Sequence, residues 1–163
     1  MERFSALNFP YYRFRVTEVA GSKRIWDPVR KRWFVMTPEE WVRVHVLRYL
    51  TEGLSIPGVM IRCEYPVSMN NQPQRADVVV CSRDGQPRMV IECKAPTVAL
   101  DDDVLSQAVR YNSILRAPYL WITNGLTHRC YQLSATGGYL AMDRLPSTSA
   151  LHLFTSSATH SDQ

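Results

Sequence analysis

The sequence predicts an α/β domain in which a mixed β-sheet is flanked by helices and preceded by an N-terminal β-hairpin. Two observations carry this prediction: short β-branched and aromatic runs are separated by turn-forming residues, and two longer segments have the apolar spacing of helices. With 163 residues, of which 45% are hydrophobic, the chain can bury a core without disulfides. We expect one domain over residues 1–145, with its core at residues 37–134, and a Ser/Thr-rich C-terminal tail over residues 146–163.

The first predicted elements are a hairpin over residues 24–36 and a helix over residues 37–53. Asp27 and the proline after it supply the turn between the two aromatic runs of the hairpin. Thr37 can cap the helix, and Glu40 completes a capping box with it. The expected fold therefore starts with a hairpin that leads directly into a helix.

Three strands, a second helix and two more strands are expected to follow. The runs VMIRCEYPVSM, RADVVVC and RMVIECKA are separated by short turn-rich segments, which indicates an antiparallel meander. Apolar residues after Pro96 recur at helical spacing, and the acids at residues 101–103 favour the start of a helix. The segment PYLWITNG then predicts a buried strand, and THRCYQLS predicts its partner.

Charge and composition limit the function only broadly. The net charge of +4 suits a polyanionic partner but is also common in proteins that have none. The sequence has no signal pattern and no apolar run of about 20 residues, so we expect a cytoplasmic protein with no membrane contact. The cysteines and histidines lack metal-ligand spacing, which argues against a zinc site or a disulfide framework.

Glu92 and Lys94 interrupt an otherwise apolar strand, and their spacing places them on the same face. The turn before that strand would bring Asp77 opposite Glu92. Two close carboxylates need a cation, and Mg2+ or Mn2+ suits these oxygens together with the backbone carbonyl of Cys93. Lys94 would then serve the attacking water and the scissile phosphate. This arrangement suits phosphodiester hydrolysis, although an isolated E-x-K is more often an ion pair on a half-exposed strand.

The surroundings of the E-x-K motif resemble those in a known group of nucleases. Asp77 precedes the motif by fifteen residues on a neighbouring predicted strand, and the helix before it carries Glu39 and Glu40. This arrangement resembles the PD-(D/E)xK nuclease superfamily, with Ala76 where that pattern usually has proline. The resemblance implies a restriction-endonuclease-like fold.

A second motif lies on the predicted helix after the E-x-K strand. Gln107 and Tyr111 are one helical turn apart, and a Q-x-x-x-Y motif in this place resembles the N-terminal nuclease domain of the type I restriction enzyme R (restriction) subunit. Short stand-alone proteins grouped with that domain are similar too, and the likeness covers residues 24–133. With the residues above, it gives as catalytic residues Asp77, Glu92, Lys94, Glu40, Gln107 and Tyr111, and as metal ligands Asp77, Glu92, the Cys93 backbone carbonyl and Glu40.

Several assignments stay open at this point. Glu40 lies on one helix stripe with Val44, so we expect it rather than Glu39 to face the site, although capping alone explains both acids. Gln107 and Tyr111 suit either support of the site or contact with the substrate. The candidates for binding DNA phosphates are Lys31, Arg32, Arg75 and Arg110.

The expected function is divalent-metal-dependent endonuclease cleavage of DNA. One alternative is a DNA-binding or assembly module that keeps the nuclease fold but does not cleave alone, and another is a structural domain with a simple ion pair. The sequence has no G-x-x-x-x-G-K-[ST] motif, so movement along DNA would require a motor or another subunit as partner. Duplex cleavage would favour a homodimer. Duplex, single-stranded or branched DNA, and RNA, all remain candidate substrates.

Overall fold

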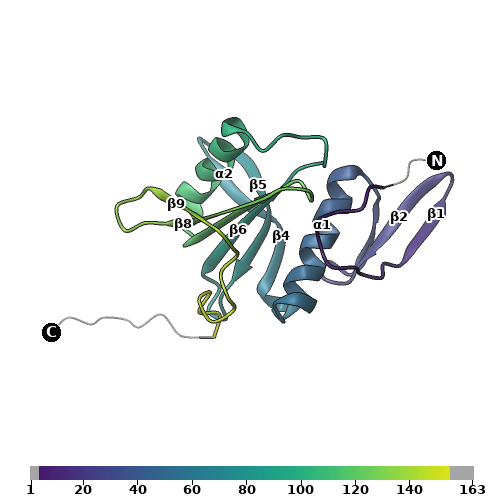
Figure 1. Cartoon of the computed structure of the whole chain (residues 1–163), viewed down its shortest axis with the longest axis horizontal. Coiled ribbons are helices and arrows are strands. Elements are labelled where there is room, and N and C mark those ends of the chain that lie inside the picture. Colours follow the sequence, from purple (N-terminus) through teal and green to yellow (C-terminus); the bar gives the residue numbers. More distant parts are fainter. Residues whose placement is uncertain (1–3, 155–163) are drawn as a thin grey trace.

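A six-stranded mixed sheet forms the centre of the protein, with helix α1 (Pro38–Arg48) packed on one face and α2 (Asp102–Leu115) on the other (Figure 1). The structure is a computed structural model that describes residues 4–154. The predicted α/β class, with a mixed sheet flanked by helices, is confirmed.

The strands of the central sheet follow one another in sequence order. They are β4 (Ile61–Met69), β5 (Gln72–Cys81), β6 (Pro87–Cys93), β7 (Tyr119–Thr123), β8 (His128–Leu133) and β9 (Tyr139–Met142). The meander β4–β5–β6 is antiparallel as predicted, and β6 and β7 are parallel because α2 carries the chain back between them. Strand β9 was not predicted, because it is a short edge strand on which Leu140 is 61% exposed and no buried alternation marks it.

A second, three-stranded antiparallel sheet precedes α1. The predicted hairpin is confirmed as β2 (Ser22–Asp27) and β3 (Arg32–Val35), and β1 (Val16–Val19), which the sequence did not predict, adds a third strand. The Asp27 Oδ1 atom accepts hydrogen bonds from the backbone N–H groups of Val29 and Arg30, and these bonds form the expected turn. In Figure 1, α1 lies between this small sheet and the central sheet.

Helix α1 begins as the sequence predicts. The Thr37 hydroxyl accepts a hydrogen bond from the N–H of Glu40 at 3.1 Å, and Pro38 occupies the first turn. The helix continues into a π-helical turn, Tyr49–Gly53, and a 3-10 turn, Gly58–Met60, leads into β4. The reciprocal half of the capping box does not form, because the Glu40 carboxylate turns to two arginines instead.

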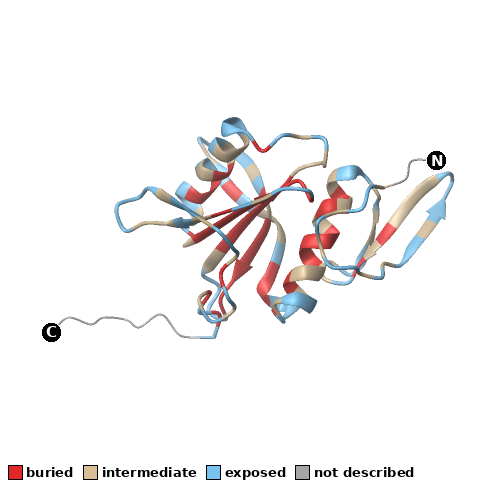
Figure 2. Cartoon of the chain, in the orientation of Figure 1, coloured by how far each residue is buried: buried red, intermediate tan, exposed pale blue. Residues whose placement is uncertain are grey.

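The two faces of the central sheet enclose two apolar cores, and the middle strands are buried (Figure 2). On the α1 side, Val46 and Leu50 pack against Val80 and Trp121. On the α2 side, Ala108 packs with Val79, Val90 and Leu120. Because these middle strands are fixed on both faces, charged side chains at their ends have defined positions.

The packed chain extends past the predicted boundary at residue 145. Leu151 and Leu153 are 0% and 1% exposed and belong to the α1-side core. Backbone carbonyls of the same two residues accept hydrogen bonds from Arg88 and Arg83. The Ser/Thr-rich composition of residues 146–163 hid these two core leucines, and the part of the predicted tail at 155–163 lies outside the described residues.

None of the helices within residues 4–154 is long and apolar enough to cross a membrane.

Asn112 ties the end of α2 to the loop before β7, and its replacement should destabilise the protein. Its side chain, 1% exposed, accepts a hydrogen bond from the N–H of Ala117 and donates to the carbonyl of the same residue. We expect Asn112→Ala to lower the free energy of unfolding by about 2 kcal/mol, because both backbone groups are left buried without partners. Urea denaturation would measure this, with the exposed neighbour Ser113→Ala as a control expected to cost less than about 0.5 kcal/mol. Equal losses in the two variants would contradict the assignment.

Candidate active site

Asp77 and Glu92 lie side by side on neighbouring strands, as the sequence predicted. The β5–β6 register pairs Val78 with Ile91. Asp77, which precedes Val78, therefore lies opposite Glu92, which follows Ile91. The Asp77 Oδ2 atom accepts a hydrogen bond from the backbone N–H of Cys93 at 2.8 Å. This bond holds the Asp77 carboxylate against the end of β6, next to the E-x-K residues.

The sheet is irregular where Asp77 lies. Ala76 packs in the α2-side core and Val78 in the α1-side core, although residues two apart in a regular strand share a face. On β4, Glu64 has a φ of +52°, and the ladder of paired residues skips Glu64 and Asp77. Irregularities of this kind redirect side chains beside functional sites, and here the Asp77 carboxylate reaches a residue of α1.

Glu92 is the buried member of the carboxylate pair. It is 3% exposed, and its Oε1 atom has no hydrogen-bond partner within residues 4–154. Burial, followed by the charge of Asp77, raises the pKa of Glu92 to about 9. An orphaned carboxyl oxygen beside a second carboxylate is a donor set that fits a hard divalent cation.

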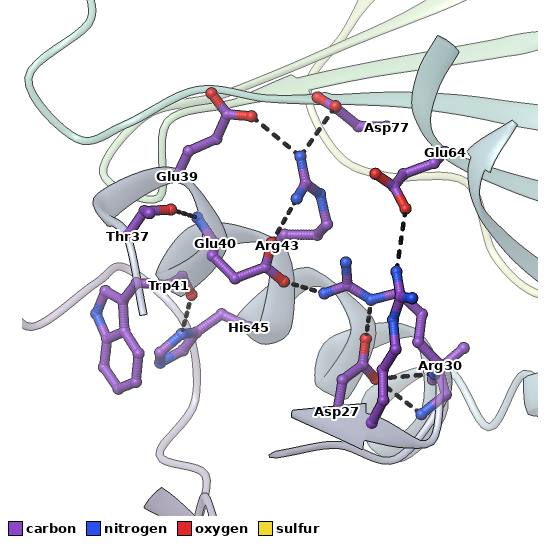
Figure 3. A network of polar contacts seen from close by, with 12 residues as sticks. Asp27, Arg30, Thr37, Glu39, Glu40, Trp41, Arg43, His45, Glu64 and Asp77 are labelled. Carbon is purple, nitrogen blue, oxygen red and sulfur yellow. Dashed lines mark hydrogen bonds and ion pairs between the residues drawn. The ribbon is translucent and has the colours of Figure 1, made fainter. Parts of the chain in front are cut away.

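Arg43 of α1 joins three carboxylates (Figure 3). Its Nη2 atom donates to Asp77 Oδ1 at 3.1 Å and to Glu39 Oε1 at 3.0 Å, and its Nη1 atom donates to Glu40 Oε2 at 2.5 Å. The Arg43 side chain is only 11% exposed. Burial is the largest single influence and opposes its charge, but Asp77, Cys93 and Glu39 together outweigh it and raise the pKa of the guanidinium. The Arg43 guanidinium therefore already supplies a positive charge at one edge of the acidic site.

Glu40 lies apart from the Asp77–Glu92 pair. Its second oxygen accepts a hydrogen bond from Arg30, which also bonds the fully buried Asp27 (Figure 3). Within residues 4–154 no group of three or more His, Cys, Asp and Glu side chains is arranged to hold a metal. The structure thus differs from the predicted three-carboxylate set, because guanidinium groups take both oxygens of Glu40.

Glu39, the acid that the sequence analysis ranked second, is the helix glutamate that shares a donor with Asp77. Both carboxylates bond the same Nη2 atom of Arg43. The Glu39 side chain is 46% exposed, whereas that of Glu40 is 8% exposed. Glu39 is therefore the helix acid that is free to turn towards a ligand.

Lys94 begins a line of hydrogen bonds that runs away from the carboxylates. Its Nζ atom donates to Gln107 Oε1 at 3.0 Å, and the Gln107 amide donates to the Tyr111 hydroxyl at 3.2 Å. The Tyr111 hydroxyl in turn donates to Gln74 Oε1 at 3.3 Å. The E-x-K and Q-x-x-x-Y motifs thus form one connected site, in which α2 fixes the position of the Lys94 ammonium.

Comparison with known proteins identifies the family of the chain. The family model of the type I restriction enzyme R protein N terminus (HSDR_N) matches residues 38–146, which include both α-helices and the whole central sheet. The chain belongs to this family. The predicted resemblance to the N-terminal nuclease region of type I R subunits is thereby confirmed. Among curated proteins, none matches the chain.

A solved structure with a similar fold comes from the same kind of protein. It is a fragment assigned to an HsdR subunit of a type I restriction enzyme from Vibrio vulnificus YJ016, with a TM-score of 0.53 and 24% sequence identity. The match covers 71% of this chain but 24% of that chain, so the HSDR_N domain spans about a quarter of its length. This likeness supports the fold, and the activity of the longer protein does not follow from it.

The predicted DNA-binding residues of this HSDR_N domain lie on its surface. Arg32, from the small sheet, and Arg75, from β5, both approach Glu64, at 3.7 and 3.9 Å. Their side chains are 63% and 71% exposed, and Lys31 and Arg110 are exposed too. Two sheets therefore present basic side chains around one carboxylate, beside Asp77 on the next strand.

The sequence indicated that Arg43 could pair with Glu39, which the structure confirms, but it gave no site role to Arg43, Arg30 or Glu64. One local signal existed for Arg43, because it follows Glu39 and Glu40 at the spacings that bring helix side chains together. The contacts of Arg30 with Glu40 and of Glu64 with Arg32 gave no such signal, since the two partners of each contact lie on separate elements of the fold.

The raised pKa of Glu92 predicts how stability depends on pH. Between its ordinary value of 4.5 and about 9, native Glu92 keeps a proton that the unfolded chain releases, so stability falls as the pH rises through this range. Glu92→Gln does not titrate, and its stability relative to wild type should increase by at most about 1.4 kcal/mol per pH unit between pH 6 and 8. Thermal unfolding in EDTA would show this. Glu18→Gln, which changes an exposed acid, is the control. The prediction is refuted if the difference in stability between Glu92→Gln and wild type does not change with pH.

Proposed function

We propose that this HSDR_N domain is a divalent-metal-dependent deoxyribonuclease in which Asp77 and Glu92 hold Mg2+ or Mn2+. The observation that supports this most is the buried Glu92 Oε1 atom, which has no partner within the described residues and lies in a carboxyl next to Asp77. Burying such a group without a partner costs stability, and a cation between the two carboxylates would offset that cost. Membership of the type I R protein N-terminal family supports DNA as the substrate.

The side chains of this domain would position the metal and the phosphate, and Lys94 would supply part of the positive charge. Mg2+ bound by the pair would polarise a phosphate oxygen and lower the pKa of the attacking water. Lys94, held by Gln107, stabilises the negative charge that develops on the scissile phosphate. Because Asp77 Oδ2 accepts the hydrogen bond of the Cys93 N–H, Oδ1 is the oxygen that would hold the metal in place of Arg43. The Cys93 carbonyl and Glu39 are the further candidate ligands.

Exposed basic residues would bind the DNA backbone. Arg32 and Arg75 reach Glu64 at distances of 3.7 Å or more, so these weak surface pairs leave both guanidinium groups free to exchange Glu64 for phosphates. Binding through them would weaken with salt. A second copy of the domain would supply the second active centre that cleavage of a duplex requires.

One observation favours a second candidate function, a module that binds DNA or assembles with a motor subunit but does not cleave alone. Arg43 already bonds Asp77 Oδ1, and a partner would then be needed to move α1 before metal binds. This chain covers 24% of the solved relative, so most of that longer protein lies outside the shared domain. This agrees with a domain that works together with a further partner.

A cleavage assay tests the proposed function. Plasmid, linear duplex, single-stranded and branched DNA would be incubated with the domain in Mg2+, Mn2+ or EDTA. We expect metal-dependent cleavage that Asp77→Asn lowers at least about 100-fold, because this change removes one charged ligand. The control is Asp143→Asn, which alters an exposed acid outside the site. Circular dichroism would show that both variants fold.

The possible results separate the two candidates. Cleavage that needs both the metal and Asp77 supports the nuclease. Binding of Mn2+ by calorimetry that needs Asp77, without cleavage of any substrate, supports the partner-dependent module. If neither cleavage nor metal binding depends on Asp77, both candidates fail and the E-x-K residues have a structural role only.

A further inference from the structure

A hollow of about 290 Å³ lies between the β4–β5 hairpin and α2, outside the carboxylate site. Four side-chain amides line it, together with a tyrosine and an arginine. These residues are Asn70, Gln72, Gln74, Gln107, Tyr111 and Arg110. None of the described residues that line the hollow is acidic.

The hollow is connected to the catalytic lysine. Gln107 belongs to the lining, and its Oε1 atom accepts the hydrogen bond from Lys94 Nζ. Tyr111 and Gln74, the next members of the same line of hydrogen bonds, also belong to the lining. A DNA strand whose scissile phosphate contacts Lys94 would therefore pass directly over this amide pocket.

The chemistry of the lining suits part of a nucleotide. Both polar atoms of the Gln107 amide are bonded, to Lys94 and to Tyr111, but Asn70 and Gln72 are exposed. A side-chain amide offers both a donor and an acceptor, which is the combination that base edges present in return. Arg110 is exposed and suits a phosphate. The volume is at the lower end of the range for small-molecule sites, so one base fits and a base-paired duplex does not.

We propose that this amide pocket binds one unpaired nucleotide of the strand being cut, with the base against the amides and its phosphate on Arg110. The inference rests on the proposed nuclease function and adds a substrate class, which is DNA with an unpaired or frayed strand next to the cleavage position. Such a base must leave its stack before it can enter. Binding also orders Gln107, and through it the position of Lys94.

Fluorescence anisotropy in EDTA tests the pocket without cleavage. The probes are a labelled 12-nucleotide single strand, the same strand with abasic sugars, and a blunt hairpin duplex of equal charge. We expect the single strand to bind more tightly than the abasic strand and the blunt duplex. Gln72→Ala should weaken binding of the single strand about tenfold and leave the abasic strand unchanged, because the lost contact is to a base. Arg110→Gln should weaken the binding of both the intact and the abasic single strand. It should also lower the slope of log binding constant against log salt concentration by about 0.7.

Two matched variants serve as controls, since both alter exposed residues of β8 outside the pocket. Gln132→Ala and Arg129→Gln should bind all three probes as wild type does. The proposal is overturned if Gln72→Ala binds the single strand as tightly as wild type does. It is also overturned if the abasic strand or the blunt duplex binds as tightly as the single strand.

The plasmid cleavage assay distinguishes this inference from the proposed function. If wild type cleaves DNA in a metal-dependent way but Gln72→Ala binds single strands normally, the pocket assignment fails and the nuclease stands. If single-strand binding needs Gln72 but no metal-dependent cleavage occurs with any substrate, the pocket stands and the nuclease assignment fails.

Discussion

Replacing Lys94 with methionine should lower the rate of DNA cleavage by at least about 100-fold, which is the usual cost of removing one preorganised charge from a developing oxyanion. Methionine keeps most of the length of the side chain but cannot donate to Gln107 or to a phosphate. Single-turnover cleavage of a labelled substrate would measure the effect, because it isolates the chemical step. Mn2+ affinity, measured by calorimetry, should change little, since Lys94 is not among the expected ligands.

Lys23→Met provides the matched control for this experiment. Lys23 lies on β2 of the small sheet, and its replacement should leave cleavage within about twofold of wild type, as expected for a surface change outside the site. Gln107→Ala should have an intermediate effect, because Lys94 would keep its charge but lose the partner that fixes it. If Lys94→Met cleaves as fast as wild type, Lys94 has no part in the chemistry.

The sequence predicted the parts of the site that depend on local spacing. An E-x-K on a buried strand and a Q-x-x-x-Y on the next helix put Glu92, Lys94, Gln107 and Tyr111 close together in any fold that packs those elements in order. The pairing of Asp77 with Glu92 followed from one short turn. These predictions succeeded because strand and helix periodicity determines which side chains share a face.

The polar network around Glu40 could not be predicted in the same way. Helical periodicity placed Glu40 towards the core, and it is buried, but its partner Arg30 comes from a turn of the small sheet. The direction of Asp77 depends on a break in the pleat opposite Glu64, which is an L-residue at positive φ. No spacing rule signals either feature, since both arise from contacts between separate elements.

The strands that the sequence missed have a common physical cause. β1 and β9 are four-residue edge strands with few buried residues, so neither alternation nor an apolar run distinguishes them from loops. Their absence from the prediction did not affect the site, because the carboxylates and Lys94 lie at the centre of the six-stranded sheet, on β5 and at the end of β6.

The buried charges form a continuous line from the small sheet to the candidate active site. Asp27 bonds Arg30, Arg30 bonds Glu40, Glu40 bonds Arg43, and Arg43 bonds Asp77 (Figure 3). Each charge in this line depends on its neighbours, since a buried ion without a partner is far more costly than a paired one. The position of α1, which carries Glu40 and Arg43, is therefore linked to the charge balance around Asp77.

Replacing Arg43 with glutamine should lower the free energy of unfolding by about 3 kcal/mol, the usual cost of removing one partner from a buried ion pair. The change leaves Asp77 Oδ1 and Glu40 Oε2 without their shared cation, and both side chains are less than one fifth exposed. Urea denaturation would measure the loss. If Asp77 and Glu92 hold a metal, Mg2+ should stabilise this variant more than it stabilises wild type, because the metal no longer competes with a guanidinium for Asp77 Oδ1.

Arg48→Gln is the control for the Arg43 experiment, because Arg48 lies on the same helix but pairs with the half-exposed Glu52. Its loss should be about 1 kcal/mol or less, and Mg2+ should stabilise it as it does wild type. If Arg43→Gln is no less stable than Arg48→Gln, the line of buried charges does not support the fold. If Mg2+ stabilises Arg43→Gln and wild type equally, Arg43 and the metal do not compete for Asp77, and the ligand oxygen must lie elsewhere in the site.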